Sequence, residues 1–200
     1  LMELSIFFCD KIIVDSHYAK KELSNILNIK KDKIEVIYLG IDEKFITNKN
    51  SKVFLKDFKY HEKYILTVLS CVKYHNIINL LKAFKVLINQ KSFNGKFVLV
   101  LQIIDKEYLE HIKNYIQSNF DENKIVLLKN INNDNLPNLY RYAELFLFTS
   151  YCEVFGLTSL EAMTQNCPVV ISNQSALPEI NQDSAVYFDP DNIADIKISI

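Results

Sequence analysis

The sequence predicts an α/β fold built on a doubly wound parallel sheet. From Tyr64 onward, short apolar runs alternate with amphipathic helical patterns, and such alternation is typical of parallel sheets covered by helices on both faces. The composition, with 49% hydrophobic and 24% charged residues in 200, is that of a globular protein of one or two domains.

The first 48 residues predict a strand, a helix and a second strand. The β-branched run 11–14 indicates the first strand, and Ser16 is a suitable N-cap for a helix over 17–27. The second strand is expected over 34–37, followed by a turn at Gly40. Residues 49–60 lack a clear period, which indicates a linker.

The remainder, 61–200, carries the alternating pattern of the predicted sheet. Apolar residues at 77, 80, 81, 84, 87 and 88 share one helical face, and Asp134 is a candidate N-cap for the helix that follows it. We expect strands over 64–68, 97–101, 125–128, 145–148, 168–171 and 185–188, and helices over 77–88, 106–118, 134–142, from 158, over 177–180 and from 193. The last helix reaches Ile200, so the carboxyl end is expected to be truncated.

Charge and cysteine usage exclude several function classes. A net charge of −1 gives no electrostatic basis for binding nucleic acid. The four cysteines form no C-x-x-C pair, and no His/Cys cluster or D-x-D motif indicates a metal site. No apolar run approaches eighteen residues and no signal peptide is recognisable, so we expect a cytoplasmic protein.

The segment 145–168 is the strongest candidate for a functional site. An apolar strand ends in a turn that contains Gly156, and a helix is expected to begin near Thr158. In a doubly wound sheet such a turn borders the ligand crevice, where the helix N-terminus favours an anion such as a phosphate. Glu153 in the turn and Glu161 in the first helical turn are then expected to face one pocket. Alternatively, Thr158 and Glu161 form only a capping box.

Three consecutive segments of this region resemble the family 4 glycosyltransferases, which have the GT-B fold. They are EVFGLTSLEAM, NCPVVISNQSALPEI and DSAVYFDPDN, within 153–192. The resemblance includes the family's pair of glutamates at the family's spacing. It implies that 61–200 form the C-terminal, Rossmann-like nucleotide-sugar-binding domain, that 1–48 are the truncated end of the amino-terminal domain, and that 49–60 link the two.

The resemblance also implies roles for the residues of the turn. Glu153 would hold the hydroxyls of the donor sugar and stabilise an oxocarbenium-like transition state, and Glu161 would bind the ribose. The N–H groups of Phe155, Gly156 and Leu157 would meet the phosphates. The residues that choose the base are expected in loops such as 130–133, where no motif is recognisable.

A second loop, after the strand 64–68, would meet the diphosphate. The family's lysine at this place aligns with His75, and Lys73 stands two residues earlier, so both are candidate phosphate contacts. The alternative is that both are ordinary surface residues. Several family glycines are also replaced, at Leu69, Leu101, Lys129, Val154, Asn166 and Gln182. A side chain at Leu69 or Val154 would fill space near the phosphates, whereas asparagine tolerates a left-handed backbone.

The expected function is therefore a retaining, metal-independent glycosyltransferase of polysaccharide biosynthesis. It needs no cofactor, and its donor substrate is a nucleotide diphosphate sugar. Its acceptor would be a glycan or a lipid-linked glycan, and peripheral membrane association through the absent amino-terminal part stays open. Two alternatives remain: a non-catalytic nucleotide-binding remnant of such an enzyme, and another doubly wound protein such as a sugar-phosphate isomerase.

Overall fold

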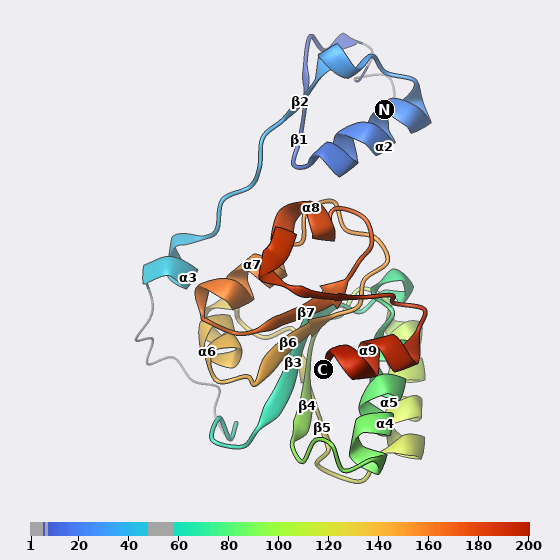
Figure 1. The fold of residues 1–200 in the computed structure, drawn as a ribbon, viewed down its shortest axis with the longest axis vertical. Helices are drawn as coiled ribbons and strands as arrows, with labels where there is room; N and C mark the ends of the chain where they lie inside the picture. Colours follow the sequence, from blue (N-terminus) through green and yellow to red (C-terminus); the bar gives the residue numbers. More distant parts are fainter. Residues whose placement is uncertain (1–5, 7, 48–57) are drawn as a thin grey trace.

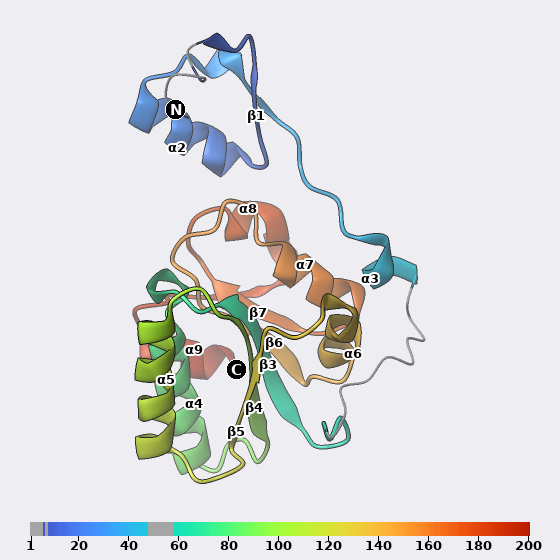
Figure 2. The same ribbon diagram turned by 180° about the vertical axis from the view of Figure 1, so that it is seen from behind.

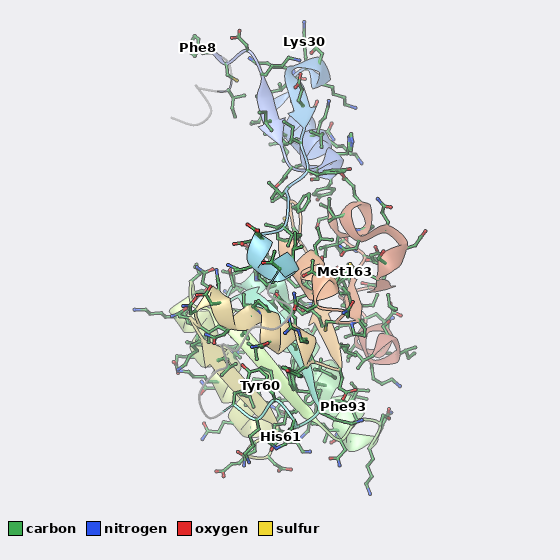
Figure 3. The ribbon with its side chains drawn as sticks, turned by 90° about the vertical axis from the view of Figure 1, so that its left-hand side faces the viewer. Phe8, Lys30, Tyr60, His61, Phe93 and Met163 are labelled. Carbon is green, nitrogen blue, oxygen red and sulfur yellow. The ribbon has the colours of Figure 1, made fainter. Side chains whose placement is uncertain are left out.

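A computed structural model describes residue 6, residues 8–47 and residues 58–200 of the chain. The described residues form a small two-stranded unit and a larger α/β unit with a six-stranded sheet, joined on one side of the molecule by the chain after β2 (Figure 1). Figure 3 shows the two ends of the long axis, with Phe8 and Lys30 at one end and His61 and Phe93 at the other. The predicted linker, 49–60, falls almost entirely outside the described residues.

The small unit matches the strand-helix-strand pattern. β1 (Ile12–Val14) pairs in parallel with β2 (Ile34–Val36), and α2 (His17–Leu27) connects them. Ser16 is the N-cap of α2, because its side-chain oxygen accepts a hydrogen bond from the Ala19 N–H at 3.0 Å. The predicted cap and both predicted strands are confirmed here, with β1 and β2 each one residue shorter than expected.

The large sheet is parallel throughout, in the order β5-β4-β3-β6-β7-β8. The chain first adds β4 and β5 on one side of β3 and then returns to add β6, β7 and β8 on the other. The predicted doubly wound parallel sheet is therefore confirmed. Its strands are β3 (Tyr64–Ser70), β4 (Lys96–Gln102), β5 (Ile125–Lys129), β6 (Leu145–Phe148), β7 (Val169–Ser172) and β8 (Val186–Phe188).

Helices cover both faces of this sheet (Figures 1 and 2). One face carries α4 (Ile77–Asn89), α5 (Lys106–Asn119) and α9 (Ile193–Ser199). The other carries α3 (Glu43–Thr47), α6 (Leu136–Arg141) and α7 (Leu157–Thr164), and the short α8 (Leu177–Asn181) lies between the sheet and α2. Because both faces are covered, the central strands are apolar and buried along almost their whole length.

The start of α6 differs from the prediction. Asp134 does not cap the helix. It lies in the middle of a 3₁₀ turn, Asn133–Asn135, and the side chain of Asn132 accepts the hydrogen bond from the Asp134 N–H at 3.0 Å. Aspartate and asparagine are both good caps, so the pattern NINNDN offered several candidate positions, and the first turn of α6 begins only after this extra turn.

The fold places a ligand crevice where β3 and β6 lie side by side. These two strands are neighbours. After β3 the chain adds strands on one side of the pair, and after β6 it adds strands on the other side. In doubly wound folds, ligands bind outside the carboxyl ends of the strands at such a switch point. The loops after β3 and β6 are the two that the sequence singles out.

Candidate functional site

A cavity of about 770 Å³ lies at the carboxyl ends of the central strands. Its wall includes the ends of β3 and β4, the loop after β5 and the loop from β6 into α7. Asp15 and Leu39 of the amino-terminal part also line it, as do Asn130, Ile131 and Asn133 of the loop in which base-selecting residues are expected. The cavity is thus at the switch point of the sheet and lies between the two parts of the chain.

The two glutamates of the turn line this one cavity. Glu153 lies in the loop before α7, and Glu161 lies within α7 itself. Glu161 is in the second turn of the helix and not in the first, because α7 begins at Leu157, one residue earlier than predicted. The two carboxylates therefore face one cavity, as the sequence pattern predicts, and Glu161 lies one turn further into the helix than expected.

The capping-box alternative for Glu161 is wrong. The N-cap of α7 is Gly156, which has no side chain with which to cap the helix. Glu161 instead accepts a hydrogen bond from the Tyr140 hydroxyl at 3.1 Å. Thr158, the other half of the supposed box, has a buried hydroxyl without a hydrogen-bond partner in the described part of the chain, and it lines the cavity.

Burial changes the acidity of Glu161. Removal from water raises the pKa of its carboxyl to about 7, although the hydrogen bond from Tyr140 and the positive charge of Lys44 act in the opposite direction. The same burial raises the pKa of the Tyr140 hydroxyl well above its ordinary value. The cavity therefore holds a carboxyl group that titrates near neutral pH.

Gly156 is required by the geometry of the turn. Its φ of +92° lies in the left-handed region, and a Cβ atom at this position would lie 2.6 Å from Leu177 Cδ2. Only glycine adopts this conformation without strain and allows α8 to approach so closely. The backbone at the start of α7 can therefore turn sharply into the cavity.

Both neighbouring parts of the protein fasten the loop that carries Glu153. The Glu153 N–H donates to the Ser175 hydroxyl at 2.8 Å, and the Ala176 N–H donates to the Glu153 carbonyl at 3.2 Å. From the amino-terminal part, the Ser16 hydroxyl donates to the Val154 carbonyl at 2.6 Å. The loop is thus held from two sides.

His75 and Lys73 lie in very different surroundings. Lys73 is exposed in the 3₁₀ turn after β3 and is not among the residues that line the cavity. His75 is buried and lines the cavity. Its Nδ1 lies 2.6 Å from the carbonyl oxygen of Ser70, and its Nε2 lies 3.1 Å from Oε1 of Glu153. Both ring nitrogens therefore have protein partners.

The replaced glycines fall into two classes. Asn166 and Gln182 have positive φ values of 58° and 46°, and for Asn166 the sequence predicted this tolerance. Leu69 and Val154 are not among the described residues with positive φ. Both line the cavity, Leu69 buried and Val154 55% exposed. Their side chains narrow the cavity without straining the backbone.

Four residues that make contacts around the site were missed by the sequence reasoning. Glu179 lies in the quoted segment but had no assigned role; it accepts hydrogen bonds from the N–H groups of His17 and Tyr18. Ser175 lies in the same segment and also had no assigned role, whereas Tyr140 carries no motif that marks it as a partner of Glu161. Ser16 was recognised as a cap, but not as a donor to the loop of Glu153. Ser175 and Glu179, which both lie in the quoted segment 166–180, had a sequence signal that could have found them.

Two kinds of site are not found in the part of the chain that the structure describes. Within residues 6, 8–47 and 58–200, no group of three or more His, Cys, Asp or Glu side chains is arranged to hold a metal ion. No helix in the same residues is long and apolar enough to cross a membrane.

A family model described as glycosyl transferases group 1 matches residues 47–200. Among curated proteins, the chain is 24% identical to the O-antigen chain mannosyltransferase RfbU of Salmonella typhimurium, over 96% of this chain and 50% of that protein. It is 30% identical to an uncharacterised glycosyltransferase of Methanocaldococcus jannaschii, over 88% of this chain and 46% of that protein. The chain thus spans about half the length of these relatives.

Solved structures show the same fold. A glycosyltransferase from Rickettsia africae superimposes with a TM-score of 0.78 at 20% identity, over 94% of this chain and 52% of that one. Anabaena HepE, in complex with UDP and glucose, superimposes with a TM-score of 0.80 at 18% identity, over 95% of this chain and 52% of that one. The predicted Rossmann-like half of a GT-B fold is confirmed.

Proposed function

Since the chain belongs to the group 1 glycosyl transferases, we propose that its cavity binds a nucleotide diphosphate sugar and that the enzyme passes the sugar to a glycan or lipid-linked acceptor. Transfer proceeds with retention at the anomeric carbon and without a metal. The observation that carries the proposal is the pair Glu153 and Glu161 on one cavity at the switch point of the sheet. Family membership leaves no basis for the sugar-phosphate isomerase alternative.

In this proposal the two glutamates bind different parts of the donor. Glu161, which lines the same cavity as the loop 130–133, accepts from the ribose hydroxyls. Glu153, next to the carboxyl end of β3, holds the hydroxyls of the sugar and stabilises positive charge on the anomeric carbon in the transition state. Each carboxylate is thereby assigned a separate role.

The diphosphate is bound mainly by backbone groups in this proposal. Phe155, Gly156 and Leu157 line the cavity where α7 begins, and their N–H groups together with the positive end of the helix dipole favour an anion there. The unpartnered hydroxyl of Thr158 adds a donor. Lys73 is exposed nearby and supplies a flexible cation from outside the cavity wall.

The names of several relatives support mannose as the first candidate sugar. The relatives include O-antigen chain mannosyltransferases of Salmonella typhimurium and Escherichia coli and the α-1,3/1,6-mannosyltransferase ALG2 of Saccharomyces cerevisiae. The same names support a glycan as the acceptor. Cytoplasmic location and peripheral membrane association stay predictions from the sequence.

A thermal-shift titration of the 200-residue chain tests the proposal. We expect one of UDP, GDP or ADP to stabilise it, by about 2.7 kcal/mol at a hundredfold excess over Kd. No shift with any of the three diphosphates, or with their sugar conjugates, contradicts the proposal. Glu161→Ala is expected to remove most of the shift, whereas Glu110→Ala, on the exposed side of α5, is the matched control and leaves it unchanged.

A sugar-transfer assay separates the enzyme from the non-catalytic remnant. In a GT-B enzyme the donor and acceptor bind to different halves, and proximity supplies much of the rate. We therefore expect the 200-residue chain, which spans about half of its relatives, to bind donor without transferring sugar to glycan or lipid-linked acceptors. The assay is then repeated with the amino-terminal half of a relative added. If the chain binds donor and sugar is transferred, it is part of an enzyme. If it binds donor and no sugar is transferred, it is the non-catalytic remnant.

A further inference from the structure

One contact in the cavity links the loops that follow the two strands at the switch point. His75 follows β3 and Glu153 follows β6, 78 residues later, and their side chains meet at 3.1 Å between Nε2 and Oε1. Both side chains are largely shielded, with 8% and 19% of their surfaces exposed. A hydrogen bond to a charged group in such surroundings is worth more than one in water.

The hydrogen-bond pattern fixes how the protons are arranged. The Ser70 carbonyl can only accept, so Nδ1 of His75 carries a proton at the 2.6 Å contact. Nε2 and the Glu153 oxygen can then bond only if a second proton lies between them, held by the imidazole or by the carboxyl group. Neither ring nitrogen is left to donate to a phosphate oxygen.

The backbone around His75 keeps the ring in this orientation. The buried Thr149 hydroxyl, at the end of β6, donates to the His75 carbonyl at 2.8 Å. The Tyr151 N–H donates to the Tyr74 carbonyl at 2.8 Å, and the Tyr74 ring packs edge-on against the imidazole with centroids 4.5 Å apart. Turning the ring toward a ligand would break the bonds to both Ser70 and Glu153.

The charged groups around His75 also support a partnership with Glu153. In the part of the chain that the structure describes, Glu153 is the carboxylate paired with the imidazole. Lys73, on the same 3₁₀ turn, is exposed and outside the cavity wall. The Phe148 ring, from β6, packs on the imidazole with centroids 6.3 Å apart. The imidazole thus has one carboxyl partner and two aromatic neighbours, Tyr74 and Phe148.

We propose that His75 is a positioning residue that holds the Glu153 carboxylate toward the donor sugar and does not bind the diphosphate. This inference rests on the proposed function, because it assigns His75 through the role of Glu153. It replaces the diphosphate contact that the sequence alignment suggested for His75. One oxygen of Glu153 is bonded to the imidazole, and the other is left for a sugar hydroxyl.

Two substitutions of His75 separate these roles. The amide nitrogen of glutamine reaches the position of Nε2, and that of asparagine reaches the position of Nδ1. His75→Gln therefore keeps a donor to Glu153, whereas His75→Asn keeps only the bond to Ser70. The measurement is calorimetric titration of the 200-residue chain and both variants with UDP, UDP-glucose, GDP and GDP-mannose.

We expect the sugar conjugate to bind more tightly than its own diphosphate. The ratio of these two affinities is the sugar-dependent gain, and we expect His75→Asn to reduce this ratio about tenfold. His75→Gln retains most of the ratio, and neither variant changes the affinity for the diphosphate alone. In a Glu153→Gln background, His75→Asn has no further effect, because the group that it positions is already changed.

Other results overturn the inference in distinguishable ways. If both variants lose diphosphate affinity equally, His75 contacts the phosphates. If both lose the sugar-dependent gain equally, His75 contributes only packing. Binding of diphosphate without a sugar-dependent gain in the parent overturns the role of Glu153. Absence of all binding overturns the proposed function instead. Nitrogen-15 spectra of the unmutated chain are a second test, since an unprotonated Nδ1 of His75 also contradicts the inference.

Discussion

Glu161 combines a predicted ligand role with an unusual acidity. Its carboxyl is pushed to a pKa of about 7 by burial, well above the ordinary value near 4.5. Between these two values the folded protein holds a proton that the unfolded chain has lost, so the free energy of unfolding falls as pH rises. Above pH 7 the destabilisation is complete, at most about 3 kcal/mol at 1.36 kcal/mol per pKa unit.

Glu161→Gln is therefore expected to stabilise the protein at high pH. Glutamine keeps an oxygen that accepts from Tyr140 but cannot ionise. We expect equal unfolding free energies for variant and parent near pH 4.5 and a gain of up to about 3 kcal/mol for the variant at pH 8, measured by urea denaturation. Glu110→Gln, at an exposed position, is the control. A variant that gains nothing between pH 5 and pH 8 would show that the carboxyl is not buried as described.

The turn before α7 depends on one glycine. Gly156→Ala forces a side chain into the left-handed region and against Leu177. We expect a loss of about 1–3 kcal/mol from backbone strain alone and weaker nucleotide binding, since the start of α7 moves. Gly40→Ala is the matched control, because a Cβ there meets nothing within 4 Å. Thermal melts and nucleotide titrations of the two variants should differ. Equal stabilities would contradict the requirement for glycine at position 156.

At the scale of elements, α2 is held onto the sheet unit by a carboxylate from α8. Oε1 of Glu179 accepts from the His17 N–H at 2.7 Å and from the Tyr38 hydroxyl at 2.9 Å, and Oε2 accepts from the Tyr18 N–H at 2.8 Å. Burial by itself would raise the pKa of Glu179, but these hydrogen bonds lower it below the ordinary value. A negative charge at a helix N-terminus is also favoured by the helix dipole.

Glu179→Ala is expected to loosen α2 without unfolding the sheet. Loss of a helix cap costs about 0.5–2 kcal/mol, so amide hydrogens of α2 should exchange several-fold faster while those of α4 do not change. Glu35→Ala is the control, because its ion pair with Lys11 is exposed and contributes little. Because the pKa of Glu179 is lowered, the contact between Glu179 and α2 contributes its full stability at pH values above the ordinary pKa. This contribution is lost as the pH falls through the lowered pKa. Unchanged exchange in α2 at pH 7 would exclude this role.

At the scale of the molecule, the chain before the undescribed segment contributes to the core of the sheet unit. Phe45 of α3 is 1% exposed and packs against Tyr140, with ring centroids 6.2 Å apart. Its carbonyl accepts from Gln165 Nε2 at 2.5 Å, beyond the end of α7. Within the described residues 8–47, α3 therefore packs with the sheet unit, whereas β1, α2 and β2 form the small unit.

Phe45→Ala should destabilise the whole sheet unit. Truncation of a buried phenylalanine removes apolar contacts and leaves a cavity, at about 3–5 kcal/mol. Denaturant unfolding followed by circular dichroism is the measurement, and Phe8→Ala, at a position that is 84% exposed, is the control. If both variants unfolded at the same denaturant concentration, α3 would not be part of the core.

The sequence by itself determined the helices and strands from Tyr64 onward and their order, but it did not predict α3. The apolar periods place α4 and α5 to within a residue or two, because a helix or strand that packs on a sheet shows its buried face as a local repeat. The turn around Gly156 and the two glutamates were also predictable. Their spacing is local, and a strand followed by a helix leads both carboxylates to the same edge of the sheet.

Only the tertiary structure decided the partners of these residues. Glu161 bonds to Tyr140, His75 bonds to Glu153, and Glu179 bonds to a helix 161 residues away in the sequence. A hydrogen bond depends on distance and direction within a few tenths of an ångström, and these are set when apolar faces pack elements against one another. The sequence pattern therefore supplies the candidate groups, and packing decides which of them face a ligand and which face each other.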